Sequence, residues 1–109
     1  MQFLSKSFVA NALGVYFCND VNFVTDCAHW TNLVSGNCYT LDAEHQNALS
    51  SFGPDAGTGC SLYDDYHCAD SPCTNLENPG STDLSHLPPG GGPTYSCNDQ
   101  INSFKCHSV

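Results

Sequence analysis

The sequence NALSSF at residues 47–52 is matched position for position by DQINSF at residues 99–104. Each hexapeptide reads polar, variable, aliphatic, polar, serine, phenylalanine. Each also closes a stretch of roughly fifty residues that opens with an aromatic segment, a spacing typical of an internal repeat. The Phe of each copy follows two small polar residues, so we expect Phe52 and Phe104 to be buried at equivalent positions.

This repeat predicts one domain, residues 13–109, made of two motifs at about residues 14–56 and 57–106. Short β-rich runs separated by Gly, Pro, Asn and Asp fill both motifs, with weak helical periodicity between them. Strands are expected at residues 15–18, 28–33, 37–41, 50–52, 60–63, 73–76, 94–97 and 102–106. One helical turn is expected within residues 42–49, with Asp42 as its N-cap. Four strands in each half predict an all-β sandwich of two Greek-key motifs.

Two further patterns resemble a known family. Spaced aromatic residues open each half, FCNDVNF at 17–23 and LYDDYHC at 62–68, and Thr25 stands where the family has glycine. The loops QNALSS at 46–51 and NDQINS at 98–103 each differ by one residue from the pattern Asn/Asp-Asn/Asp-x-x-Ser/Thr-Ser. Over about residues 14–106 the chain therefore resembles the βγ-crystallin superfamily, in its small, secreted, cysteine-rich fungal type.

The resemblance implies calcium as a candidate cofactor, although none is required. In the family, each of two sites takes oxygen ligands from both motifs, and calcium prefers six to eight such oxygens. The residues at the matching positions are Asn47, Ser50, Asp99 and Asn102, with backbone carbonyls near Gln46 and Asn98. Alternatively, these polar loops only bond their own backbone.

Eight cysteines indicate that disulfides stabilise this small fold. The even count fits four bridges, and their pairing stays open because eight cysteines allow 105 pairings. The nearest two cysteines, Cys68 and Cys73, are separated by four residues, and the sequence contains no Cys-x2-Cys knuckle. Free or metal-bound thiols are therefore the weaker alternative. The predicted disulfide cysteines are Cys18, Cys27, Cys38, Cys60, Cys68, Cys73, Cys97 and Cys106.

Charge and the N-terminus bear on compartment and partners. Eleven acidic residues stand against Lys6, Lys105 and no arginine. Nucleic acids and anionic membranes are bound by clustered cations, so neither is expected as a partner. Residues 1–12 read as a short signal segment with a small-x-small site at Ala10–Ala12, and a first strand is the alternative. We therefore expect a secreted, extracellular protein.

The residues do not favour catalysis. Neither a Gly-x-Ser-x-Gly elbow nor a His-Glu-x-x-His helix occurs in the sequence, and the adjacent Asp64 and Asp65 would point apart. The sequence favours a monomeric, non-enzymatic effector- or toxin-like module that binds an extracellular protein or glycan. The alternatives are a calcium-binding or structural protein and a protease inhibitor. The predicted interaction loop is Leu87, Pro88, Pro89, Gly90, Gly91, Gly92 and Pro93, because a Pro/Gly-rich loop held near disulfides is preorganised.

Overall fold

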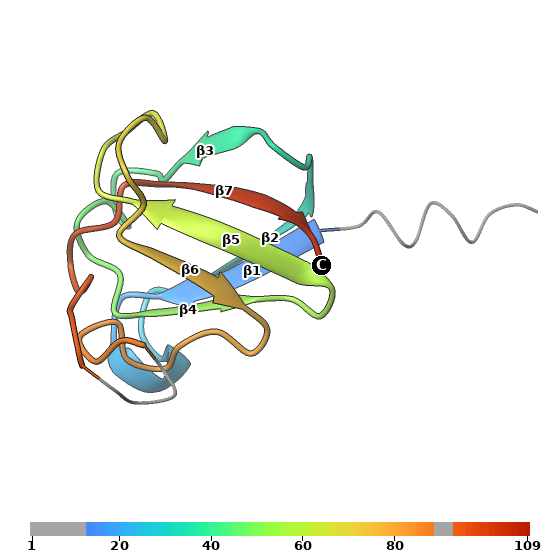
Figure 1. Ribbon diagram of the computed structural model, residues 1–109. Helices are drawn as coiled ribbons and strands as arrows, with labels where there is room; N and C mark the ends of the chain where they lie inside the picture. Colours follow the sequence, from blue (N-terminus) through green and yellow to red (C-terminus); the bar gives the residue numbers. More distant parts are fainter. Residues whose placement is uncertain (1–12, 89–92) are drawn as a thin grey trace, which may run out of the picture.

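The computed structural model describes residues 13–88 and 93–109, and the predicted signal segment at residues 1–12 lies outside this range. Seven strands and one short 3-10 helix, η1, make up the described chain (Figure 1). They are β1 Leu13–Cys18, η1 Val21–Phe23, β2 Ala28–Leu33, β3 Cys38–Thr40, β4 Ser51–Pro54, β5 Thr58–Tyr63, β6 Thr74–Glu77 and β7 Ser103–Ser108. Within the described residues, no helix is long and apolar enough to cross a membrane.

The strands form two antiparallel sheets that pack face to face. One sheet has three strands in the order β2-β1-β4, and the other has four in the order β3-β7-β5-β6 (Figure 1). The inner pairs correspond between the sheets, because Phe17 lies opposite Phe52 in β1 and β4, and Leu62 lies opposite Phe104 in β5 and β7. The predicted all-β, two-motif Greek-key sandwich is therefore confirmed.

The two halves exchange their third strands. β3 belongs to the first half but pairs with β7 of the second, with Tyr39 opposite Phe104. In return, Ser81 of the second half pairs with Phe52 of β4 through a single β-bridge. Glycine precedes this bridge because Gly80 has φ 84°, and a Cβ there would collide with the carbonyl oxygen of Phe52. Neither half therefore completes its own sheet.

Of two further predicted elements, one is wrong and one is confirmed. Residues 94–97 do not form a strand, since only Tyr95 is paired, to Leu87, before the chain turns at Cys97. Residues 42–49 contain the expected single helical turn, because the N–H groups of His45 and Gln46 both donate to the carbonyl of Asp42, at 3.0 and 3.2 Å. Asn47, with φ 54°, leaves the right-handed helical region and ends the turn. Within the described residues, the second half therefore contributes three strands and two isolated bridges, at Ser81 and between Leu87 and Tyr95, not the four strands expected from the sequence.

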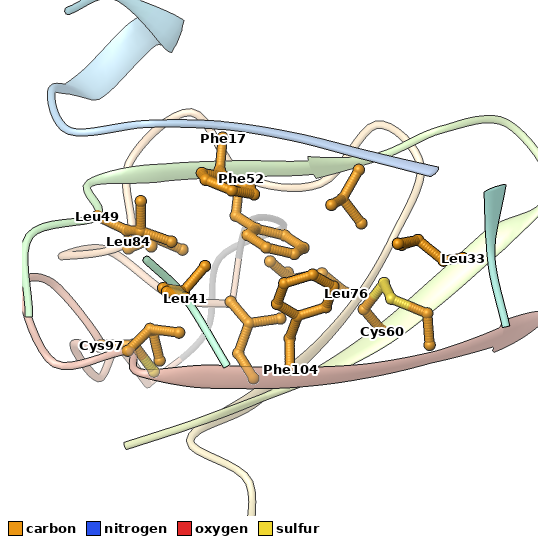
Figure 2. Close-up of a cluster of buried hydrophobic side chains, with 14 of the residues drawn as sticks. Phe17, Leu33, Leu41, Leu49, Phe52, Cys60, Leu76, Leu84, Cys97 and Phe104 are labelled. Carbon is orange, nitrogen blue, oxygen red and sulfur yellow. A yellow bond between two sulfur atoms is a disulfide. The ribbon is translucent and has the colours of Figure 1, made fainter. Parts of the chain in front are cut away.

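A cluster of aromatic rings fills the space between the sheets (Figure 2). Phe17 stacks on Phe52 at 5.9 Å between ring centroids, and Phe52 meets Phe104 edge-on at 5.5 Å. All three rings are completely buried, as the hexapeptide repeat predicts for two of them. Trp30 and Tyr39 complete the cluster by packing on Phe104 from strands β2 and β3. Edge-on and offset contacts of this kind are preferred by aromatic rings.

All eight cysteines lie within the described residues and form four disulfides, as predicted. The pairs are Cys18–Cys27, Cys38–Cys68, Cys60–Cys106 and Cys73–Cys97. Cys60 and Cys106 sit directly opposite each other in β5 and β7. Disulfides at this density are compatible with an extracellular protein.

Disulfides also hold the segment in which the family pattern has glycine. Thr25 has φ 68° and Cys68 has φ 53°, so both residues adopt the left-handed conformation that glycine reaches without strain. Each such non-glycine residue costs about 1–2 kcal/mol. The bridge Cys18–Cys27 closes the first of these turns, and Cys38–Cys68 anchors the second at Cys68 itself. Covalent links therefore maintain a conformation that the local sequence does not favour.

The equivalence of Phe52 and Phe104 predicts equal sensitivity to truncation. We expect Phe52→Ala and Phe104→Ala each to lower the free energy of unfolding by about 3–5 kcal/mol, because each leaves a cavity in the shared core. Urea midpoints of the oxidised proteins measure the loss, and Val34→Ala, at a side chain 55% exposed, is the control, with a change below about 0.5 kcal/mol. A loss confined to one of the two Phe variants would contradict the equivalence.

Candidate functional site

Two polar loops, residues 46–51 and 98–103, cross at one end of the sandwich. The backbone N–H of Asn47 donates to the carbonyl of Ile101 at 3.2 Å, and that of Asp99 donates to the carbonyl of Leu49 at 3.0 Å. Asn47 and Asp99 also share a left-handed conformation, with φ 54° and 57°. Each loop is therefore held by the other, and the two loops are related by the internal repeat.

The serine that ends each loop fastens the preceding hairpin. The hydroxyl of Ser51 donates to the carbonyl of Asp20 at 2.8 Å and accepts from the N–H of Phe23 at 3.2 Å. The hydroxyl of Ser103 repeats both bonds, to the carbonyl of Asp65 at 2.6 Å and from the N–H of Cys68 at 3.1 Å. These buried hydroxyls are fully used, so the last serine of each loop has a structural role.

The structure brings two predicted ligands, Asn47 and Asn102, into direct contact. The Nδ2 of Asn102 donates to Oδ1 of Asn47 and to the carbonyl oxygen of Asp64, both at 2.8 Å. It also lies 3.5 Å from the carbonyl oxygen of Gln100. Asn102 is 3% exposed, and its Oδ1 has no hydrogen-bond partner among the described residues. At this first site, three oxygens from three segments thus surround one amide nitrogen.

The repeat defines a second site with different chemistry. The N–H of Ser50 donates to the carbonyl of Cys18, just as the N–H of Asn102 donates to that of Tyr63, so Ser50 takes the place of Asn102. By the same repeat, Asp99 corresponds to Asn47, and the carbonyls of Asn19 and Ala48 correspond to those of Asp64 and Gln100. All of these groups offer oxygen ligands, one of them a carboxylate, and calcium prefers oxygen ligands. It includes the other two predicted ligands, Ser50 and Asp99.

A buried histidine fixes the first loop to its surroundings. His45 is 3% exposed, with Nδ1 at 2.7 Å from Oδ1 of Asp42 and Nε2 at 2.7 Å from the carbonyl oxygen of Asp26. Both ring nitrogens face acceptors, and only the protonated ring can donate to both. Burial lowers the pKa of His45, but the hydrogen bonds to Asp42 and Asp26 and the charges of Asp42 and Glu44 outweigh it. The net effect raises the pKa above the ordinary value of 6.5.

This arrangement predicts a pH-dependent stability. Because folding raises the pKa of His45, its contribution is fully present below about pH 6.5 and is lost as the pH rises through the higher folded value. We expect the free energy of unfolding to fall as the pH rises above about 6.5, and His45→Gln to flatten that decline. Urea titrations at each pH measure the slope, and His107→Gln, at the exposed end of β7, should leave it in place. An unchanged slope in His45→Gln would contradict the assignment.

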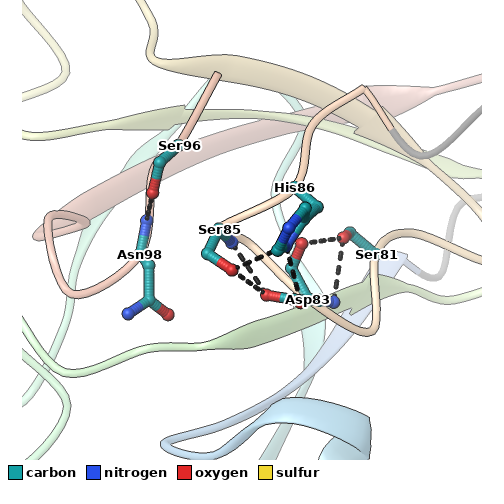
Figure 3. A network of polar contacts seen from close by, with 6 residues as sticks. All are labelled: Ser81, Asp83, Ser85, His86, Ser96 and Asn98. Carbon is teal, nitrogen blue, oxygen red and sulfur yellow. Dashed lines mark hydrogen bonds and ion pairs between the residues drawn. The ribbon is translucent and has the colours of Figure 1, made fainter. Parts of the chain in front are cut away.

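A Ser-His-Asp group on the surface does not have catalytic geometry (Figure 3). Both Ser85 Oγ and Asp83 Oδ2 lie 3.0 Å from the same nitrogen, Nδ1 of His86. In a catalytic triad the two ring nitrogens serve different partners. Here Ser85 donates directly to Asp83 at 2.5 Å through its hydroxyl and at 2.9 Å through its backbone N–H. These two bonds, with the contact from His86, lower the pKa of Asp83, so this carboxylate organises a turn.

Two acidic groups place carboxylates within reach of a common ion. In one, Asp65 accepts backbone N–H bonds from His67, Ala69 and Asp70, and the bond from Ala69 is the main cause of its lowered pKa. Asp64 and Asp70 lie beside it. In the other group, Asp42 and Glu44 lie next to His45, whose nitrogens already have partners. The central residues of the two groups, Asp65 and His45, are therefore already held by hydrogen bonds within the chain.

The predicted interaction loop is only partly at the surface. Leu87 is completely buried in the core and exchanges two backbone hydrogen bonds with Tyr95, at 2.9 and 2.8 Å, so it belongs to the packed interior. Pro88 and Pro93 are exposed, and residues 89–92 lie outside the described part of the chain. Leu87 is therefore unsuited to contact a partner directly.

Sequence reasoning missed the backbone contributors to these sites. The carbonyl oxygen of Asp64 contacts Asn102, and Asn19 follows β1 as Asp64 follows β5, but a backbone carbonyl leaves no residue signature. Their place immediately after the aromatic strands was the available signal. The role of His45 was also missed, because its partner Asp26 lies nineteen residues away.

Solved βγ-crystallin structures have the same fold. The N-terminal domain of Protein S matches with a TM-score of 0.61 and 17% identity over 88% of this chain and 97% of that domain. A βγ-crystallin from Ciona intestinalis has a TM-score of 0.59 and 19% identity over 86% of this chain and 99% of that chain. A βγ-crystallin from an archaeon has a TM-score of 0.60 and 18% identity over 91% of this chain and 100% of that chain. No family model and no curated protein matches the sequence. The chain therefore has the βγ-crystallin fold, reached with a widely different sequence.

Proposed function

We propose that this protein is a secreted, non-enzymatic βγ-crystallin-type domain that binds calcium between its two crossed loops. The observation that supports this best is the matching backbone hydrogen bonding of the two loops, by which Asp99 and Ser50 correspond to Asn47 and Asn102. Ion binding there would connect segments of both motifs and so stabilise the interlocked fold.

The two sites differ in how well they suit calcium. At the second site, a carboxylate, a hydroxyl and two carbonyls supply only oxygen, and Asn19 carries a side-chain oxygen that is buried without a partner among the described residues. At the first site, an amide nitrogen already lies among the oxygens. The second site therefore fits the ion better, and with a single carboxylate its affinity should be modest.

Calcium should raise the melting temperature of the protein. Each tenfold increase of the calcium concentration above Kd adds about 1.4 kcal/mol to the free energy of unfolding. In a domain of this size, each kcal/mol raises the melting temperature by roughly 4–8 °C. Asp99→Gly should abolish most of the shift, because it removes the carboxylate while glycine still suits φ 57°. Differential scanning calorimetry in EDTA and in millimolar calcium measures it.

Two controls separate site binding from general charge screening. Glu77→Gln removes a carboxylate on β6, outside the loops, and should keep the full shift. Magnesium at the same concentration should produce a smaller shift, because it is reluctant to give up its water ligands. If calcium leaves the melting temperature of the unmodified protein unchanged, the calcium proposal is wrong.

We further propose that the domain acts outside the cell as an effector- or toxin-like module of the small, cysteine-rich fungal type. This role is supported by an exposed aromatic group on the outer face of the three-stranded sheet. The ring of Tyr16, 37% exposed, lies 5.6 Å from that of Phe23 and 6.1 Å from that of His29. Tyrosine is enriched among the residues that carry binding energy at protein interfaces, so an extracellular protein is the favoured partner.

The effector role can be tested through Tyr16. Unmodified protein and Tyr16→Ser are screened by biolayer interferometry against extracellular receptor domains and, in parallel, against a glycan array. Binding to a receptor domain that falls at least tenfold in Tyr16→Ser is expected, since interface tyrosines often contribute about 2 kcal/mol. Val34→Ser is the matched control for an exposed apolar residue elsewhere. Glycan binding alone, or equal binding by Tyr16→Ser, would contradict the proposed protein partner.

A further inference from the structure

The environment of Asn102 differs from that of an ordinary buried amide. Its NH2 group faces oxygens from three separate segments: Asn47 in the first loop, Asp64 after β5, and Gln100 in the second loop. An NH2 group has two hydrogens, and they match the two short contacts of 2.8 Å. The third oxygen, at 3.5 Å, completes an oxygen-lined space around the nitrogen.

The orientation of this amide follows from electrostatics. With Nδ2 directed at the three oxygens, Asn102 makes two good hydrogen bonds, and its buried Oδ1 is left without a partner among the described residues. The opposite orientation would place Oδ1 about 2.8 Å from two other oxygens, which is repulsive unless a cation lies between them. The partial positive charge of the NH2 group therefore takes the place that a cation would need.

The repeat supplies an internal comparison. Ser50, which corresponds to Asn102, has a short hydroxyl side chain that does not carry a nitrogen into its site, and Asp99 there supplies a carboxylate. The two sites share their backbone hydrogen bonds, since Ser50 and Asn102 donate to Cys18 and Tyr63 in the same way. The difference between the sites thus lies in the side chains at two related positions.

We propose that the Asn102 amide is a built-in substitute for a cation, so that the first site is closed and the protein binds one calcium ion, at the Asp99/Ser50 site. This inference rests on the calcium binding proposed above only for the single occupied site. The closed site joins Asn47 to the end of β5 without any ion, and the identity of residue 102 determines the number of ions bound.

The proposal predicts the stoichiometry of four proteins in isothermal titration calorimetry with calcium chloride. The unmodified protein should bind one ion. Asn102→Ser removes the amide and should bind two, whereas Ser50→Asn introduces an amide at the related position and should bind none. The double variant Ser50→Asn/Asn102→Ser exchanges the two side chains and should again bind one. Circular dichroism and the mass of the four disulfide-bonded proteins verify that each variant is folded and oxidised.

The outcomes separate this inference from the calcium proposal. Two ions bound by the unmodified protein would overturn the inference but leave calcium binding in place. No ion bound by the unmodified protein but one by Asn102→Ser would support the inference and overturn calcium binding at the Asp99/Ser50 site. Equal stoichiometry in Asn102→Ser and the unmodified protein, or an ion retained by Ser50→Asn, would show that the amide does not exclude calcium.

Discussion

The exchange of third strands between the two halves is the feature on which the rest of the structure depends. Because β3 pairs with β7 while Ser81 pairs with Phe52 of β4, each sheet contains backbone from both halves. The exchange brings the ends of β4 and β7 together, so the loops that precede them must cross. Those crossed loops in turn place Asn47 beside Asn102, which makes a site out of residues fifty-five positions apart.

Disulfides and serine hydroxyls both stabilise the hairpins, but in different ways. Ser51 and Ser103 provide directional hydrogen bonds that fold each hairpin onto its sheet. The disulfides at Cys27 and Cys68 keep residues with positive φ in conformations that would otherwise relax. A chain with glycine at these positions would not need covalent links for this purpose. The cysteine content and the missing hairpin glycines therefore belong to one structural solution.

The parts of the fold that short sequence patterns encode were predictable, and the parts that depend on long-range pairing were not. The hexapeptide repeat correctly indicated that Phe52 and Phe104 are equivalent and buried, because alternation and a shared local pattern determine which way a side chain points. In the second half, the third strand is reduced to a single bridge at Ser81. This was not predictable, since a single bridge has no periodicity in the sequence. Leu87 was misplaced because the Pro- and Gly-rich residues around it obscured one apolar residue whose partner, Tyr95, lies eight positions away. The disulfide pairing likewise required the fold to be known.

The distribution of the four disulfides has a topological consequence. Cys18–Cys27 lies within the first half, and Cys60–Cys106 and Cys73–Cys97 lie within the second, so Cys38–Cys68 is the one bridge that joins the halves. The halves meet in sequence at the exposed turn of Ala56 and Gly57, where a protease would have access. A chain cut there would be a two-chain molecule linked by one covalent bond, with the exchanged strands still interlocked. The two fragments would stay linked after cleavage and could separate only once the Cys38–Cys68 disulfide was reduced.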